Sequence, residues 1–177
     1  SFQRRLSENI RNAPPIVETI HSIAPVDLGK PRSRGVGSDV SVHRVQGVQD
    51  IPNKVRSIIT KWLSSQNAVE RSSVAVLCPD EQVCDAVVDS LNAGHVRAER
   101  LSKRALGGKR RNCILVATID EFKGLEKPLI CVAGLGNPEE HARFSHLAYA
   151  AFSRANHTLA FVCTEGEART MIELERF

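Results

Sequence analysis

The sequence contains no apolar run long enough to cross a membrane and no signal-peptide pattern at its start. It also lacks a C-x-x-C pair, and its five cysteines and six histidines are scattered along the chain. An odd number of dispersed cysteines is not typical of a disulfide framework or of a zinc site. We therefore expect five free, mostly buried thiols, no metal site, and an intracellular, reducing location, either cytoplasmic or nuclear.

The composition is that of one ordinary globular domain. With 177 residues, 42% of them hydrophobic and 25% charged, the chain can bury a core of its own but is short for two domains. The net charge of +4 permits a phosphate-bearing partner, but it is equally typical of a mildly basic surface. Because the chain begins at Ser1 and its first residues already fall within a motif, we expect residues 1–177 to be a single domain excised from a longer polypeptide.

Two apolar runs of strand length organise the chain. Residues 114–117 and 128–133 are apolar on both faces, which favours parallel strands covered by helices on each side. Apolar spacing elsewhere predicts further strands and helices, so the fold class is α/β with a mainly parallel sheet. The further strands are expected at 40–45, 74–78, 96–101 and before 163, and the helices at 13–20, 51–63, 80–91, 147–154 and 165–177.

Between the two runs lies a dense polar set, which follows the carboxyl end of the first predicted strand. That edge is where open α/β sheets bind ligands, so we expect a binding site there. Lys123 can bind phosphate or pair with a neighbouring acid, and the residues support both interpretations equally. The polar set consists of Thr118, Asp120, Glu121, Lys123, Gly124 and Glu126.

Three segments resemble motifs of superfamily 1 helicases of the UvrD/Rep type. Thr118-Ile-Asp-Glu-Phe-Lys123-Gly124-Leu125-Glu126 resembles their fifth motif, T-x-H-x-x-K-G-L-E, and Leu147-Ala-Tyr149-Ala-Ala-Phe-Ser153-Arg154-Ala155 resembles the sixth, L-x-Y-V-A-x-T-R-A. Asn9-Ile10-Arg11-Asn12 resembles the fourth, N-Y-R-S/N. The resemblance covers most of the chain and implies the second RecA-like domain of such a motor, a three-layer α/β fold. Residues 102–112 leave no room for the accessory subdomain that many of these proteins insert there.

The resemblance also implies an ATP site shared with a missing N-terminal RecA-like domain, which would carry the Mg²⁺ ligands. In that site Arg154 and Arg11 would act as arginine fingers on the γ-phosphate, and Glu126 beside Gly124 would contact the ribose. Asn9 and Ile10 would lie beside the nucleotide, but Ile10 stands where the family has a tyrosine and cannot stack on adenine as a ring does. Arg154 also has a simpler explanation, as a cation that pairs with the dipole of a helix C-terminus.

The same resemblance implies a contact with a single-stranded nucleic acid, DNA or RNA, at Thr118, Asp120 and Lys123. Asp120 replaces the family's histidine, and a carboxylate repels phosphate. The sequence has no G-x-x-x-x-G-K-[ST] loop, so we expect no ATP turnover by this chain alone. The expected function is the C-terminal motor domain of an ATP-dependent helicase or translocase. The alternative is a non-catalytic binding or regulatory module, which the departures at Ile10 and Asp120 favour.

Overall fold

The computed structural model describes residues 8–9, 12–23, 30–31, 40–64, 69–101 and 112–174. Six strands form one sheet in the order β3-β8-β7-β4-β6-β5, and every neighbouring pair is parallel. The short strands β1 (Glu8–Asn9) and β2 (Lys30–Pro31) pair with each other outside this sheet. The strands of the sheet are β3 (Val40–Val45), β4 (Val74–Cys78), β5 (Ala98–Arg100), β6 (Ile114–Thr118), β7 (Lys127–Ala133) and β8 (Ala155–Thr164).

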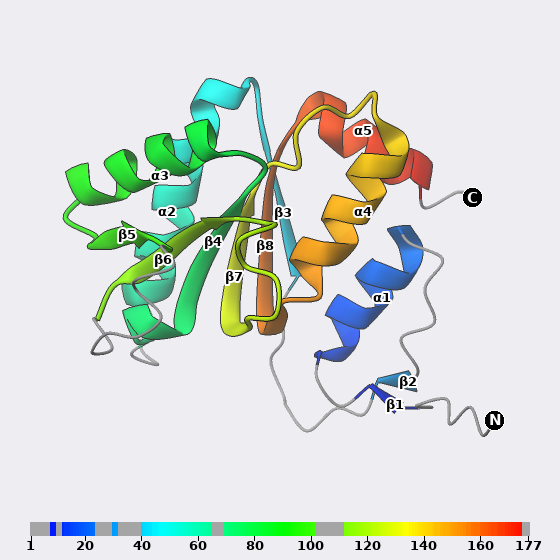
Figure 1. Ribbon diagram of the computed structural model, residues 1–177, viewed down its shortest axis with the longest axis horizontal. Helices are drawn as coiled ribbons and strands as arrows, with labels where there is room; N and C mark the ends of the chain where they lie inside the picture. Colours follow the sequence, from blue (N-terminus) through cyan, green and yellow to red (C-terminus); the bar gives the residue numbers. More distant parts are fainter. Residues whose placement is uncertain are drawn as a thin grey trace.

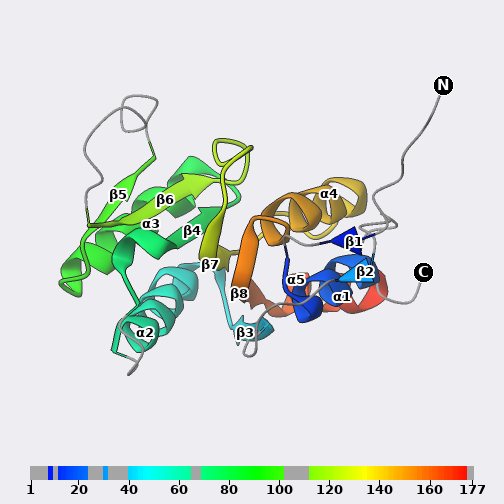
Figure 2. The same cartoon turned by 90° about the horizontal axis from the view of Figure 1, so that it is seen from below.

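Helices cover both faces of the sheet, which gives three layers (Figure 1). One face carries α2 (Ile51–Ser64) and α3 (Glu81–Ala93), and the other carries α1 (Pro14–Ile23), α4 (His141–Phe152) and α5 (Glu165–Leu174). Figure 2 shows the two groups of helices on opposite sides of the central strands. Short 3₁₀ turns, Val48–Asp50 and Arg71–Ser73, precede α2 and β4. The three-layer, mainly parallel α/β architecture predicted from the sequence is confirmed.

Strand β4 shows why the central strands are apolar throughout. Its five residues are all buried. Ala75 and Leu77 pack toward α1 and α4, whereas Val76 and Cys78 pack toward α2 and α3. Successive side chains of a strand point to opposite faces, so a strand covered on both sides has no solvent-facing position for a polar residue.

Most element boundaries agree with the sequence, and the differences have local causes. Strands β3 and β4 have the predicted bounds, and α3 begins after Asp80, whose carboxylate accepts the Val83 N–H at 2.9 Å as an N-cap. Helix α4 begins at His141, earlier than predicted, because Phe144 is the one buried residue among 142–146 and a single apolar position gives no helical periodicity. Residues 119–124, which follow β6, form a series of turns.

The connection from β6 to β7 determines where the candidate site residues lie. The two strands are parallel in one sheet, so the chain leaves β6 at the carboxyl edge and must enter β7 at the amino edge. The register agrees, because Thr118 pairs with Cys78 at the end of β4, whereas Lys127 pairs with Ala155 at the start of β8. Residues 119–126 therefore run from one edge of the sheet to the other, as the loop beside β7 shows in Figure 1.

All five cysteines are buried and free, which confirms the prediction for the thiols. Burial raises the pKa of the Cys131 thiol from its ordinary value of 9.0 to about 12. Within the described ranges no three His, Cys, Asp or Glu side chains are grouped as metal ligands would be. None of the described helices is long and apolar enough to cross a membrane.

The Cys131 thiol predicts a loss of stability at alkaline pH. The folded protein keeps the thiol protonated up to about pH 12, whereas the unfolded chain ionises it near its ordinary value of 9.0. The stabilising contribution is thus fully present below about pH 9 and is lost as the pH rises toward 12. We expect the urea midpoint to fall more steeply over this range in the wild type than in Cys131→Ala. Equal slopes in equilibrium denaturation would contradict the assignment.

Candidate functional site

The first group of site residues lies at the amino edge of the sheet, in the turn between α4 and β8. The Arg154 N–H donates to the Ala151 carbonyl at 3.1 Å, and the Arg154 carbonyl accepts the Lys127 N–H at 3.2 Å. The Arg154 Nε donates to the Ala150 carbonyl at 3.0 Å, on the last turn of α4. This is the contact that a helix-end cation makes. A guanidinium has several further donors, so this contact and a role at a phosphate are compatible.

Asn12 joins the N-terminal segment to this turn. Its side chain is buried, and its amide Nδ2 donates to the carbonyls of Ser153 and Ala155 at 3.1 and 2.7 Å. The accepting carbonyls flank Arg154, so the segment that resembles the fourth helicase motif lies against the one that resembles the sixth. Arg11 and Ile10 lie outside the described residues, and of Asn9 the structure describes only its place in β1.

Glu126 and Gly124 precede β7 and belong to the same connection. Glu126 is exposed immediately before the strand, whose first residue bonds to Arg154. Gly124 has a φ of +82°, a conformation that favours glycine, and no atom lies within 4 Å of where its Cβ would be. The positive φ thus accounts for glycine here, and the space beside it is open.

The polar set predicted at a single carboxyl edge is therefore divided. Thr118 lies at the carboxyl edge, whereas Glu126 lies at the amino edge with Arg154. The prediction that the whole set lies at the carboxyl edge was wrong. The sequence shows that these residues follow a strand, but it does not show that their connection crosses to the opposite edge of the sheet.

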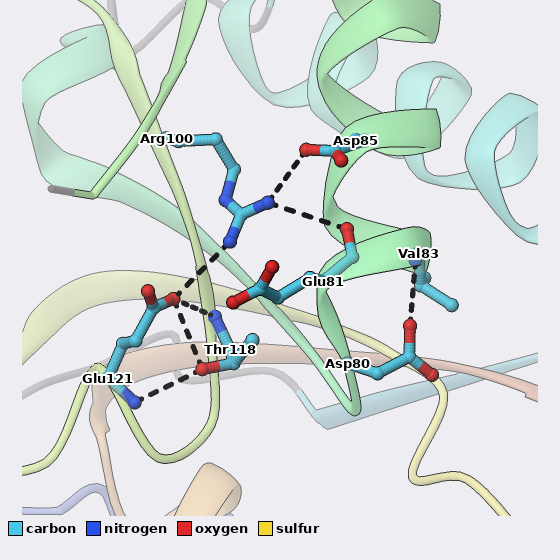
Figure 3. A network of polar contacts seen from close by, with 7 residues as sticks. All are labelled: Asp80, Glu81, Val83, Asp85, Arg100, Thr118 and Glu121. Carbon is cyan, nitrogen blue, oxygen red and sulfur yellow. Dashed lines mark hydrogen bonds and ion pairs between the residues drawn. The ribbon is translucent and has the colours of Figure 1, made fainter.

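At the carboxyl edge, Thr118 and Glu121 bond to each other (Figure 3). The Thr118 N–H and hydroxyl donate to Glu121 Oε2 at 2.9 and 3.1 Å, and the Glu121 N–H donates to Thr118 Oγ1 at 3.2 Å. This is a capping box, in which a threonine and a glutamate three residues later satisfy each other's backbone donors. The donors of Thr118 that a phosphate would use are thus occupied by a carboxylate. The T-x-x-E spacing is a sequence signal for this contact, which the sequence analysis missed.

A second capping box follows β8. The Thr164 N–H and hydroxyl donate to Glu167 Oε2 at 2.7 and 3.0 Å. Glu167 is buried, and its other oxygen accepts the Leu135 N–H at 2.6 Å. The same local pattern therefore fastens the loop after β7 to the start of α5.

Arg100 links the Thr118 turn to α3 (Figure 3). Its guanidinium donates to the Asp85 carboxylate at 2.7 Å and to the Glu81 carbonyl at 3.4 Å, and lies 3.7 Å from Glu121. Two carboxylates, those of Asp85 and Glu121, thus share one guanidinium at this edge. The guanidinium beside the Thr118 turn is therefore already paired with carboxylates.

Lys123 pairs with Asp120, with 2.8 Å between Nζ and Oδ1. Their hydrogen bond is the main cause that holds the pKa of Asp120 below its usual range. Both side chains are exposed, so the pair contributes little to stability. Of the two interpretations of Lys123, the structure shows the ion pair, and phosphate binding stays a prediction.

Comparisons with known proteins agree on the fold. No family model and no curated protein matches the sequence. Among solved structures, the C-terminal domain of a possible DNA helicase from Lactobacillus plantarum WCFS1 aligns with a TM-score of 0.60 at 19% identity, over 93% of this chain and 96% of that one. A DEAD box protein from Methanococcus jannaschii aligns with a TM-score of 0.51 at 16% identity, over 84% of this chain and 42% of that one.

These likenesses establish a class of fold. The chain has the RecA-like α/β fold of helicase C-terminal domains, with a six-stranded, all-parallel sheet.

The Asp120–Lys123 pair can be tested by titration. Lys123→Ala removes the partner that lowers the pKa of Asp120, so this pKa should rise toward its usual value, as carboxyl NMR would show. Arg143→Ala is the matched control, because Arg143 lowers the same pKa with a smaller effect. An unchanged Asp120 pKa in Lys123→Ala would mean that the pair does not form in solution.

Proposed function

We propose that this chain is the second motor domain of an ATP-dependent, UvrD-like superfamily 1 helicase or translocase that acts on single-stranded nucleic acid. The observation that carries the proposal is the Asn12 amide on the two carbonyls that flank Arg154. It joins the segments that resemble the fourth and sixth helicase motifs, although they are 141 residues apart. The helicase-type fold supports the same proposal.

In this proposal the amino edge of the sheet completes an ATP site. An N-terminal RecA-like domain of the same polypeptide carries the phosphate loop and the Mg²⁺ ligands. Arg154 and Arg11 contact the γ-phosphate, since a guanidinium is always charged and its planar fork matches phosphate oxygens. Glu126 accepts a hydrogen bond from the ribose, beside the open space at Gly124. Asn9 and Ile10 lie beside the nucleotide.

The carboxyl edge is the proposed nucleic-acid contact, through Thr118, Asp120 and Lys123. Hydroxyl and backbone N–H groups commonly bind the phosphates of nucleic acids. Here Glu121 already accepts from both of these groups on Thr118, and Asp120 adds a second exposed carboxylate. A phosphate must therefore displace Glu121, so binding to this domain alone is weak.

The hydrogen bonds from Thr118 to Glu121 favour a second candidate function, a non-catalytic binding or regulatory module with a helicase fold. In that case Glu121 is simply the structural partner of Thr118, and Arg154 is a helix-end cation anchored on Ala150. The two candidates differ in what the Arg154 guanidinium does, so the decisive experiment removes it.

The motor hypothesis predicts a large loss of ATP turnover in Arg154→Ala. In the full-length protein kcat should fall about 10³–10⁵-fold, the range typical of an arginine finger, with a smaller change in KM. Arg154→Lys should recover only part of the rate, because it keeps the charge but loses the fork.

The matched control is Arg143→Ala, which removes an exposed arginine from α4 and should leave kcat unchanged. The 177-residue chain alone, which has no phosphate-loop motif, provides the baseline without turnover. An unchanged kcat in Arg154→Ala would favour the module.

The nucleic-acid contact predicts that Asp120→His strengthens binding of a labelled single-stranded oligonucleotide. The change removes a carboxylate that repels phosphate, and Asp120→Asn separates the loss of charge from the gain of the imidazole. Binding should weaken as salt rises, because each neutralised phosphate releases counterions. Anisotropy across a salt series measures both effects. If the wild type and both variants fail to bind at low salt, the carboxyl edge has no nucleic-acid role.

A further inference from the structure

The strongest unassigned feature is the side chain of Asn12, which is buried yet polar. Only 5% of its surface is exposed, and its single amide nitrogen donates to two backbone carbonyls, those of Ser153 and Ala155. An asparagine amide carries two N–H donors on one atom, so it can make both bonds at once. Serine offers one donor, and an ionised aspartate of the same shape offers none.

These two bonds complete a set that holds the backbone of Arg154. The Arg154 N–H is tied to α4 through Ala151, and its carbonyl is tied to β7 through Lys127. Without Asn12, the carbonyls on either side of Arg154 would lose a buried donor, at a cost in free energy for each. The turn is therefore fixed by α4, by β7 and by the segment before α1 together.

We propose that Asn12 is a positioning residue for Arg154. It holds the 153–155 turn in place and ties that turn to the segment immediately before α1. The link to catalysis rests on the proposed function, whereas the mechanical role of Asn12 does not.

Hydrogen exchange tests the mechanical role in the chain itself. In Asn12→Ala the Lys127 amide, which donates to the Arg154 carbonyl, should exchange about tenfold faster or more, since two hydrogen bonds that hold the turn are lost. Asn12→Asp, which keeps the shape but loses the donors, should do the same. Exchange at the amides of β4, a buried central strand, measures any change in global stability, and the Lys127 exchange rate is corrected for that change.

Asn92→Ala is the matched control. Asn92 also joins two elements through its side-chain amide, donating to the Ala98 carbonyl at 3.2 Å and accepting the Ala98 N–H at 3.1 Å, but it does so between α3 and β5. This variant should accelerate exchange at Ala98 and leave Lys127 unchanged. If it accelerates Lys127 as much as Asn12→Ala does, the effect is global and the inference is overturned.

Kinetics in the full-length protein test the catalytic consequence. A misplaced catalytic group can cost about 10²-fold in rate, so Asn12→Ala should lower kcat by about that factor while KM changes little. If Asn12 acts through Arg154, the double variant Asn12→Ala/Arg154→Ala should be no slower than Arg154→Ala alone. If the fold-losses in kcat of the two single variants multiply in the double variant, Asn12 acts independently of Arg154 and the inference is overturned.

The two proposals fail in different ways. If Arg154→Ala leaves kcat unchanged, the motor function fails, and exchange at Lys127 still decides whether Asn12 holds the turn. If Arg154→Ala lowers kcat but Asn12→Ala does not, the motor function stands and the positioning role in catalysis is wrong.

Discussion

The constraint on which the rest of the structure depends is the parallel direction of all six strands. Every connection between strands that follow one another in the chain must return from the carboxyl edge to the amino edge of the sheet. From β3 to β4, from β4 to β5 and from β7 to β8 a helix makes this return, but between β6 and β7 residues 119–126, which contain turns and no helix, make it. One motif-bearing segment therefore reaches both edges, with Thr118 at one and Glu126 at the other. Its ends can serve different ligands because the sheet separates them.

The two capping boxes show that one local pattern can have different consequences. Glu121 and Glu167 each accept from the threonine that ends a strand. Glu167 is buried and also accepts the Leu135 N–H, so it fastens a loop into the core. Glu121 is exposed beside Arg100, where its charge also affects any anion that approaches. The pattern specifies the turn, whereas burial and neighbouring charges decide what else the carboxylate does.

The sequence predicted what depends on local periodicity. Apolar runs such as Val74–Cys78 identified the parallel strands, because burial on both faces excludes polar side chains. The two T-x-x-E capping boxes could also have been predicted, because their spacing is a local sequence signal. The contact of Asn12 with the 153–155 turn could not be predicted, because no local pattern specifies a partner 141 residues away. Only the resemblance to helicase motifs suggested that these segments meet, and it assigned Asn12 no role.

The two edges of the sheet differ in how well they suit phosphate. At the amino edge, backbone bonds and the Asn12 amide hold a turn that carries a guanidinium, so little reorganisation is needed to present Arg154 to an anion. At the carboxyl edge, carboxylates repel an anion and one of them occupies the donors of Thr118. Of the two contacts proposed above, the one at the amino edge therefore needs less rearrangement of hydrogen bonds. If one of the two proposed contacts is absent from this protein, the occupied donors of Thr118 favour the loss of the nucleic-acid contact.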